Sequence, residues 1–430
     1  MAAALLLAAI AGAAHGSPWR QTQFMVGGFG STSFGDPAVF RRLDQAGLDL
    51  VVPAPVGGYE GSQRERALAA RTLLKLQGPR FHLRMLGYGV DSVAVLDSLL
   101  RYPTSRELWV WDEPSAAQTP LAAERVARVS RSRASPPLAL ANLFPAYAFP
   151  TDKATAYPDY VESFLSRFGA EPAPVVSVDH YMFEPPVPRD DFYFTLRVVR
   201  DAVARHAASA RRTPVWVWIQ LARNASAPAN PTPTLGQIRF AAYTALAYGA
   251  KGIFYWTVSP VDFGAGGNYR DGLLSATGDT TTAPPGRYSA IRALNRELHA
   301  LGRTLLALES VAVMHEDTLA QVLVGDELPG GAAAPRTVLG ERGHNRWCMV
   351  GELRASARAR TRYLLVVNQN TEAPQSFTID LAARAQAVDR IGRSDGVARR
   401  VGAGLRAIVV RHLPAGTGEL YRVTWSARAR

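Results

Sequence analysis

The sequence predicts an α/β protein, a (β/α)8 (TIM) barrel followed by a small antiparallel β-sandwich. From residue 24 to about residue 305, eight short apolar runs alternate with helical patterns. Eight such βα units in a stretch of this length are typical of a (β/α)8 barrel. After about residue 305 the helical patterns fade, and short strand patterns separated by Gly- and Pro-rich stretches continue instead.

The eight barrel strands are predicted where Val, Ile, Phe, Tyr and Trp cluster, because these residues favour strands. The runs are 24–30, 48–55, 81–87, 107–113, 138–144, 175–183, 215–220 and 252–258. A doubly wound open sheet is the alternative. It is less favoured because the glycine-rich "GGFGSTSFG" after the first strand lacks the spacing of a dinucleotide-binding turn.

Three segments between these strands carry clear helical signals. Segment 36–47 begins with Asp-Pro and ends with Gly, and segment 62–78 also ends with Gly. Segment 190–212 carries apolar residues at spacings of three and four. In the C-terminal region, strands are predicted at 362–370, 375–382, 405–413 and 419–425. The expected domains are a signal peptide at 1–17, the barrel at 18–305 and the sandwich at 306–430.

The N-terminus resembles a secretory signal peptide. Residues 2–14, AAALLLAAIAGAA, form an apolar run, and the small residues Gly16 and Ser17 follow it. The run lacks a basic segment before it and is too short to span a bilayer comfortably. We therefore expect a secreted or lumenal protein without an integral membrane segment.

The chain is basic, with a net charge of +12, but its charge pattern does not favour nucleic-acid binding. Of 48 basic residues only Lys75, Lys153 and Lys251 are lysine, and the arginines are scattered over amphipathic segments. No basic arm or known nucleic-acid-binding motif is present. We expect a solvated arginine-rich surface, and a surface that binds polyanions remains an alternative. The single cysteine, Cys348, excludes a disulfide within the chain.

Two adjacent carboxylates, Asp112 and Glu113, follow the apolar run of the fourth strand, and Pro114 ends it. In a (β/α)8 barrel the active site lies at the carboxyl ends of the strands, which is where this pair falls. The alternative is that the two acids only cap the following helix.

Other polar and aromatic residues are also candidates, and those from the fifth to the eighth strand are expected at the same rim. Arg84, on the third strand, would orient a carboxylate or bind an acidic sugar, and a buried ion pair is the alternative. The remaining candidates, from the fifth to the eighth strand, are Asn142, Asp179, His180, Tyr181, Gln220, Tyr255 and Trp256.

The residues that several other kinds of active site require are absent from the sequence or wrongly placed in it. The first strand has no histidine, no His-Glu-x-x-His is present, and we expect neither a metal nor a cofactor. Lys251 precedes the eighth strand, at the wrong end for a Schiff base, and no Gly-x-Ser-x-Gly occurs. Carboxylates in an aromatic-lined cleft remain, and they suit a carbohydrate substrate.

The chain resembles the clan of (β/α)8-barrel glycoside hydrolases, in particular its β-galactosidase-like branch. Asp112-Glu113-Pro114 stands where the clan has Asn-Glu, often followed by Pro, and "YTALAYGAKGIFYWT" (243–257) is similar to the passage into the eighth strand. The C-terminal segment resembles the β-sandwich that ends many of these enzymes. The resemblance implies a glycosidase in which Glu113 is the general acid/base and Trp256 is the aromatic floor under the sugar.

One departure from the clan is serious, because Gln220 stands where the clan places its nucleophilic Glu. Asp179 is the best candidate for the second carboxylate, or Asp112 is the working acid, or the reaction inverts configuration. Lesser candidates for the second carboxylate are Glu60, Glu184 and Asp262. The remaining alternative is a non-catalytic carbohydrate-binding barrel. The oligomeric state is not predicted.

Overall fold

The protein was analysed as a computed structural model. The structure describes residues 19–30, 36–52, 72, 76, 82–88, 107–131, 137–169, 171–183, 187–206, 213–227, 229–263, 267–280, 284–316, 323–327, 337–357 and 359–425. The predicted signal peptide and most of the predicted helix at 62–78 lie outside these residues.

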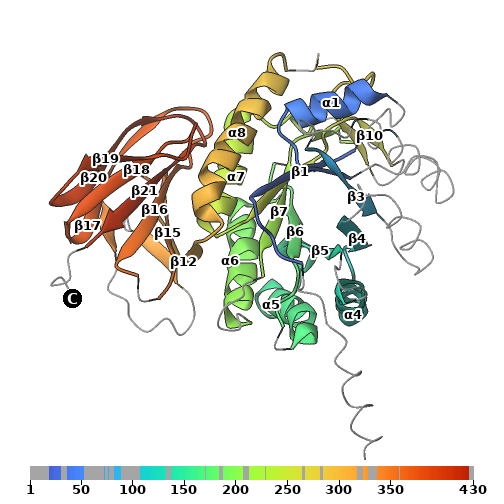
Figure 1. The fold of residues 1–430 in the computed structure, drawn as a ribbon, viewed down its shortest axis with the longest axis horizontal. Helices are drawn as coiled ribbons and strands as arrows, with labels where there is room; N and C mark the ends of the chain where they lie inside the picture. The colour runs from blue at the N-terminus through green and yellow to red at the C-terminus, as the bar shows by residue number, and fades with distance from the viewer. Residues whose placement is uncertain are drawn as a thin grey trace, which may run out of the picture.

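Eight parallel strands close into a barrel, which confirms the predicted fold (Figure 1). The last strand pairs with both the seventh and the first, so the sheet has no free edge. The strands are β1 (Met25–Phe29), β2 (Leu50–Val52), β3 (Arg84–Tyr88), β4 (Glu107–Asp112), β5 (Leu138–Leu143), β6 (Val176–His180), β7 (Val215–Gln220) and β9 (Gly252–Trp256).

Helices surround the barrel and begin with local capping signals. Asp36 caps α1 through a side-chain hydrogen bond from the Ala38 amide, and Thr234 and Gln237 form a capping box on α7. The described helices are α1 (Pro37–Gln45), α4 (Thr119–Ser130), α5 (Lys153–Leu165), α6 (Arg189–Arg205), α7 (Leu235–Ala247) and α8 (Arg287–Leu305), with short 3-10 turns η1 (Ala146–Ala148) and η2 (Ser166–Phe168).

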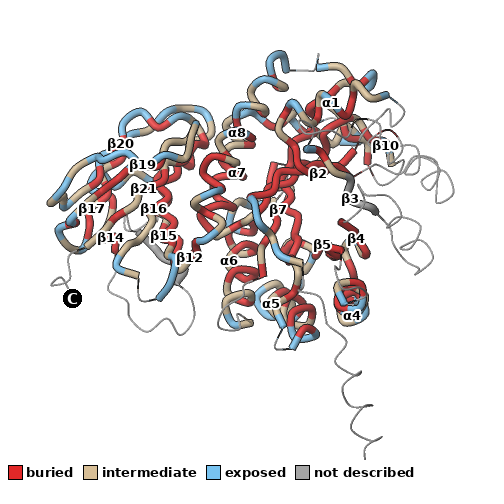
Figure 2. The backbone as a smooth tube through the Cα atoms, in the orientation of Figure 1, coloured by how far each residue is buried: buried red, intermediate tan, exposed pale blue. Residues whose placement is uncertain are grey.

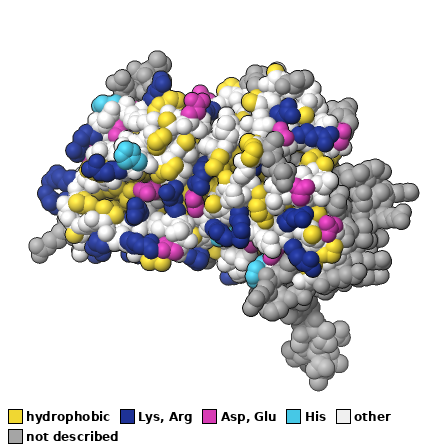
Figure 3. Space-filling model, turned by 90° about the horizontal axis from the view of Figure 1, so that it is seen from above, with side chains coloured by type: hydrophobic (Ala, Val, Ile, Leu, Met, Phe, Trp, Pro, Cys, Tyr) yellow, Lys and Arg dark blue, Asp and Glu magenta, His cyan; other side chains and the backbone are white. Residues whose placement is uncertain are grey.

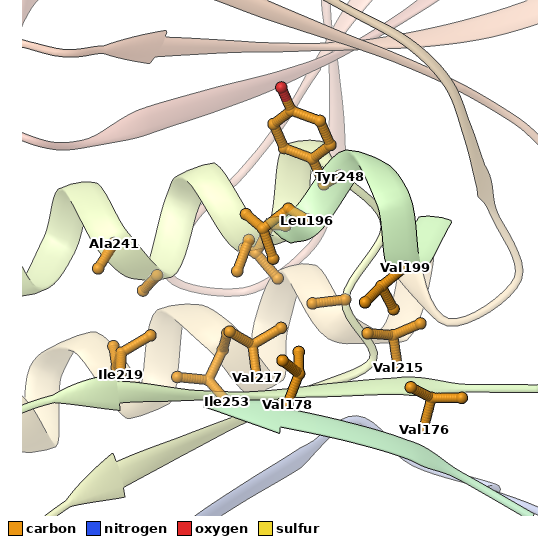
Figure 4. Packing of buried hydrophobic residues seen from close by; sticks show 14 of the residues in the cluster. Val176, Val178, Leu196, Val199, Val215, Val217, Ile219, Ala241, Tyr248 and Ile253 are labelled. Carbon is orange, nitrogen blue, oxygen red and sulfur yellow. The ribbon is translucent and has the colours of Figure 1, made fainter. Parts of the chain in front are cut away.

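The strand residues that face outward pack against these helices (Figure 4). Val176 and Val178 of β6 and Val217 of β7 meet Leu196 and Val199 of α6 in one buried cluster. Figure 2 shows the barrel strands as mainly buried and the surrounding helices as buried along part of their length. Each such side chain contributes roughly 1.5–3 kcal/mol when fully buried, so this layer is a main source of stability.

The barrel interior is filled mainly by large side chains and is not a pore. Trp109, Trp216, Trp218 and Phe254 are at most 2% exposed and belong to one cluster inside the strands. Trp109 and Trp218 lie with ring centroids 5.0 Å apart, and Trp216 stacks on Phe254 at 4.7 Å. Such packing leaves polar chemistry only to the ends of the barrel.

Gly27 on β1 makes room for one of these rings. A Cβ atom at Gly27 would lie 2.2 Å from Cε1 of Phe254, whereas one at Gly340 in the sandwich would meet nothing within 4 Å. We expect Gly27→Ala to lower the free energy of unfolding by about 1–3 kcal/mol through overpacking, and Gly340→Ala to leave it nearly unchanged. Urea denaturation measures both, and equal effects would contradict this description of the interior.

The C-terminal β-sandwich begins at Glu309, shortly after α8 ends at Leu305, and lies beside the barrel (Figure 1). A seven-stranded sheet has the order β13-β12-β15-β16-β21-β18-β19, and a three-stranded sheet has the order β14-β17-β20. The strands are β12 (Glu309–Glu316), β13 (Leu323–Glu327), β14 (Val338–Glu341), β15 (Cys348–Arg354), β16 (Thr361–Asn368), β17 (Gln375–Ala385), β18 (Ala387–Ile391), β19 (Ala398–Gly402), β20 (Leu405–Leu413) and β21 (Gly418–Thr424).

The seven-stranded sheet is buried on both faces along β16. Leu364 and Val366 belong to the core between the two sheets of the sandwich, while Leu365 and Val367 join the core that includes the helical layer of the barrel. Tyr193 of α6 donates a hydrogen bond of 2.7 Å to Oε1 of Gln369 in the sandwich. One apolar core therefore spans the contact between the two domains, and the sandwich has a second core between its two sheets. Among the described residues, no helix has the length and apolar character needed to cross a membrane.

Candidate active site at the carboxyl end of the barrel

The end of β4 is bent by a β-bulge that decides where its carboxylates point. The register with β5 shifts between Trp109 and Trp111, so Trp109 lies in the barrel interior while Trp111 packs outward beneath the guanidinium of Arg125. Asp112 is then paired with Asn142 of β5. Since paired residues of parallel strands share a face, the bulge turns Asp112 toward the mouth of the barrel.

Glu113 directly follows the strand and adopts a left-handed backbone conformation, with φ of 45°. This conformation is uncommon for a residue with a side chain and is held here by the surrounding structure. The Glu113 amide donates to the Asn142 carbonyl at 2.9 Å, and its carboxyl group hydrogen-bonds the carboxyl group of Asp179. The turn thus brings Glu113 and Asp179 into contact.

A chain of buried polar groups orients Asp179. Asn142 Nδ2 donates to Asp179 Oδ1 at 3.0 Å, and Ser177 Oγ donates to Asn142 Oδ1 at 2.9 Å. Trp218 Nε1 in turn donates to Ser177 Oγ at 3.0 Å. Every hydrogen bond in this series has a defined donor and acceptor, so the carboxyl group of Asp179 has one preferred orientation.

Burial and neighbouring charge raise the pKa of two of these three carboxyl groups, Glu113 and Asp179. Burial, followed by the charge of Asp112, raises the pKa of Glu113 from 4.5 to about 7, and the hydrogen bond with Asp179 offsets part of this. Burial, followed by the charges of Glu113 and Asp112, also raises the pKa of Asp179 well above its usual value. The cluster of carboxyl groups therefore retains a proton near neutral pH, as a general acid must.

Aromatic rings lie beside these carboxyl groups. Tyr181 follows β6 and stacks on Trp256 of β9, with ring centroids 5.7 Å apart. Phe263 lies parallel to Trp256 at 5.8 Å, and Phe29 lies 4.6 Å from it. Phe263 follows β10 (Val261–Asp262), which forms a small sheet with β11 (Asn268–Arg270) and β8 (Arg223–Asn224). The structure thus places Tyr181 and Trp256 on the predicted rim.

Gln220 lies at the end of β7, and backbone groups hold its amide. Its Oε1 accepts a hydrogen bond of 3.0 Å from the Phe183 amide, and its Nε2 donates to the Ala222 carbonyl at 3.3 Å. Gln220 is 1% exposed. Its side chain therefore braces the loop after β6 as well as the chain after β7.

Two predicted sugar-binding residues face the helices instead of the mouth, and those predictions were wrong. His180 Nδ1 lies 3.1 Å from Thr195 Oγ1 of α6, and burial together with the charge of Lys153 lowers its pKa to about 3. Tyr255 donates a hydrogen bond of 2.6 Å to Asn295 of α8. Neighbouring residues of a strand point to opposite faces of the sheet. His180 therefore points to the helices while Asp179 points into the barrel, and Tyr255 points to the helices while Trp256 points into the barrel.

Arg84 lies on the predicted third strand but away from the mouth of the barrel. It is the first residue of β3, at the amino end of the barrel, where it forms an ion pair with Glu107. It lines a cavity of about 1010 Å³ at that end, together with Trp19 and His299. The alternative of an ion pair was therefore the right one for Arg84.

Of the lesser candidates, Glu60 and Glu184 lie outside the described residues. Asp262 lies on β10 and is exposed, and its Oδ2 accepts a hydrogen bond from Asn268. Within the part of the chain that the structure describes, no three His, Cys, Asp or Glu side chains are placed to hold a metal ion.

Comparison with solved structures identifies the fold. The chain aligns with a catalytic mutant of Gan42B, a GH42 β-galactosidase from G. stearothermophilus, over 96% of this chain and 100% of that one, with a TM-score of 0.54 and 8% identity. It aligns with a β-galactosidase from Bacillus circulans sp. alkalophilus over 95% and 100%, with a TM-score of 0.50 and 11% identity. The chain shares the fold of these two β-galactosidases. No family model and no curated protein matches its sequence.

Tyr160 of α5 joins the two strand ends that carry the site. Its hydroxyl donates to the Pro114 carbonyl at 2.9 Å and accepts from the Phe144 amide at 3.1 Å. Pro114 directly follows Glu113, and Phe144 lies two residues after Asn142. Tyr160 therefore holds Glu113 in position without being part of the carboxyl group cluster.

If Glu113 acts as a catalytic acid, replacing Tyr160 with Phe should reduce turnover more than it reduces substrate affinity. The change leaves two buried backbone groups without partners and costs about 1–3 kcal/mol of stability. Tyr288→Phe, which removes a hydrogen bond of 2.7 Å from α8 to the Arg42 carbonyl of α1, is the matched control. It should lower stability without changing kcat, and an equal fall of kcat in both variants would refute the positioning role.

Sequence reasoning missed Ser177 and Tyr160. Ser177 lies two residues before Asp179 and so shares its face, which the alternation of the strand could have indicated. Tyr160 lies in a helix far from either strand end in sequence, and no pattern indicates its contact with Pro114.

Proposed function

We propose that the protein is a glycosidase that hydrolyses O-glycosidic bonds of an oligo- or polysaccharide, with Glu113 as the proton donor. The observation that carries the proposal is the pKa of Glu113, which burial and the neighbouring Asp112 raise to about 7. A carboxylic acid that keeps its proton near neutral pH can protonate the oxygen of a leaving sugar.

The neighbouring groups suit the charge that develops in this reaction. Departure of the protonated leaving group gives a transition state resembling an oxocarbenium ion, and the negative charge of Asp112 would stabilise it. Asp179 also has a raised pKa, so it would lose its proton before it acts as the nucleophile or as the base for water. It lies opposite Glu113 in the cluster, and Asn142 holds its orientation.

Substrate must separate the two carboxyl groups before reaction. Glu113 and Asp179 are in direct hydrogen-bond contact, which is closer than the roughly 5–5.5 Å of retaining or 6.5–9.5 Å of inverting glycosidases. In the proposed complex the glycosidic oxygen takes the place of Asp179 as the hydrogen-bond partner of Glu113.

Trp256 and Tyr181 would form the sugar-binding wall. The Trp256 indole N–H is buried and has no acceptor among the described residues, so a sugar hydroxyl could accept its hydrogen bond. Aromatic side chains with one polar group suit ligands that have both C–H and O–H surfaces. Asn142 is committed to Asp179 and Ser177, so we assign it to positioning the carboxylate instead of binding sugar.

Gln220 favours a second candidate, a barrel that binds carbohydrate without cleaving it. An amide cannot act as a nucleophile in this reaction, and this one is already engaged by two backbone groups. The same cluster would then recognise sugar hydroxyls only.

A hydrolysis screen separates these candidates. Purified protein would be incubated with a panel of natural polysaccharides and oligosaccharides at about pH 5–7, the range over which Glu113 keeps its proton, and new reducing ends would be measured. The glycosidase proposal predicts release from at least one member of the panel. Binding to a member without release from any of them would support the second candidate and reject the first.

We also propose that residues 1–17 are a signal peptide and that the mature protein is exported. The apolar run at 2–14 and the small residues after it support this. Mass spectrometry of the protein from its native source should then find a mature chain that lacks this segment. An intact N-terminus in the native protein would reject the proposal.

A further inference from the structure

A polar groove crosses the seven-stranded sheet of the sandwich beyond the area that the barrel covers. The cross-strand pairs Tyr363–Arg422, Arg422–Asp389 and Asp389–Arg400 place four residues in one row across β16, β21, β18 and β19. Two positions further along the same face of these strands, Leu365, Leu420 and Ile391 lie in the core shared with the barrel. We name the groove of about 440 Å³ around Asp389, Arg400, Arg422, Thr361 and Thr424 the basic groove.

The charges in the basic groove do not balance. Arg400 Nε lies 2.7 Å from Asp389 Oδ1, and Arg422 Nη2 lies 3.0 Å from Asp389 Oδ2. Although burial acts to raise the pKa of Asp389, the hydrogen bonds from Arg400 and Arg422 lower it below its usual value, so this group is a carboxylate. Two cations therefore share one anion, and the groove has one positive charge in excess.

Both arginines keep donors for another anion. Their side chains are 59% and 39% exposed, whereas the Asp389 side chain is only 6% exposed. Each guanidinium group has five N–H donors, and Asp389 uses one from Arg400 and two from Arg422. The remaining donors form planar pairs that match the oxygens of a carboxylate or sulfate group.

We infer that the basic groove binds the carboxylate or sulfate groups of an acidic polysaccharide. The choice of a glycan as the carrier of these groups rests on the proposed function of the barrel. A shallow groove along a sheet suits an extended chain, and the hydroxyl groups of Thr361 and Thr424, 3.3 Å apart, provide partners for sugar hydroxyls. Arg side chains are also spread over the part of the molecular face formed by the sandwich (Figure 3).

Binding to defined oligosaccharides tests the inference without measuring turnover. Full-length protein would be titrated calorimetrically with a galacturonate oligosaccharide, a sulfated heparin oligosaccharide, a neutral dextran oligosaccharide and a DNA duplex. At least one acidic oligosaccharide should bind, with an affinity that falls as salt concentration rises. The affinity for the neutral oligosaccharide should be lower by about ten-fold or more. The carboxylated and sulfated probes show which anionic group the groove prefers.

Two variants that each remove one positive charge locate the site. Arg400→Gln should weaken binding of the acidic oligosaccharide by roughly five- to twenty-fold, since Arg422 still pairs with Asp389 and preserves the fold. Arg342→Gln, at an exposed ion pair with Asp380 outside the groove, should leave binding nearly unchanged. If Arg400→Gln does not fold, Arg400→Lys keeps the charge but loses the planar fork, and it should still weaken binding by about two-fold or more.

Three results would overturn the inference: no binding of either acidic oligosaccharide, equal losses in the Arg400 and Arg342 variants, or DNA binding of equal strength with the same dependence on Arg400. Failure here is distinct from failure of the proposed function. Turnover without binding in the groove would leave the glycosidase proposal intact, and binding in the groove without turnover would leave this inference intact.

Discussion

Replacing Glu113 with Gln will lower the rate of glycan hydrolysis by about 100- to 10,000-fold, the range that a general acid contributes. The amide keeps the size of the side chain and can still hydrogen-bond Asp179, but it has no proton to transfer. The loss should appear in kcat measured on the glycan that the hydrolysis screen identifies. Substrates with good leaving groups, which need little protonation, should lose much less activity.

Glu124→Gln is the matched control for this substitution. Glu124 lies on α4 in the same barrel, and its side chain is 59% exposed beside Arg167. The control should retain full activity. A Glu113→Gln variant that turns over the natural glycan at the wild-type rate would remove Glu113 from the mechanism.

The same substitution will stabilise the protein above neutral pH. The pKa of Glu113 is raised from 4.5 to about 7 on folding, so between these values the folded protein binds more protons than the unfolded chain does. The free energy of unfolding therefore falls as pH rises across this window and levels off above it. The size of the shift corresponds to a loss of about 3 kcal/mol that Glu113→Gln should avoid.

Urea denaturation on either side of this window, at about pH 5 and about pH 8, checks this expectation. The difference in unfolding free energy between Glu113→Gln and the wild type should increase in favour of the variant from the lower to the higher pH. Glu124→Gln should follow the wild type at both values. A difference between Glu113→Gln and the wild type that stays constant with pH would show that Glu113 ionises normally in the folded protein.

The barrel could be predicted from the sequence because each of its strands is a separate run of strand-forming residues. The predicted strand 215–220 coincides with β7, and 138–144 differs from β5 by one residue at its end. In the sandwich, β20 coincides with the prediction at 405–413. The sandwich strands β12, β13, β14, β15, β18 and β19 were not predicted. For the edge strand β19 the reason is plain, since its sequence, ARRVG, is exposed and carries no alternating apolar pattern.

The site was less predictable, because it depends on which face of a strand each residue occupies. The sequence places Asp112 and Glu113 at a strand end but contains no signal for the bulge between Trp109 and Trp111 that directs Asp112. Asp179 and Trp256 were expected correctly at the carboxyl end, while His180 and Tyr255 were not separated from them. Alternation within β6 and β9 would have made that separation.

The titration of the Glu113 carboxyl group is the most direct test of the account, since its raised pKa carries the proposed function. Protein labelled with carbon-13 at the glutamate side-chain carboxyl can be titrated by NMR, and the Glu113→Gln variant assigns the signal. We predict a midpoint at about pH 7, as burial and the charge of Asp112 require. A midpoint near 4.5, the ordinary value for glutamate, would contradict the account.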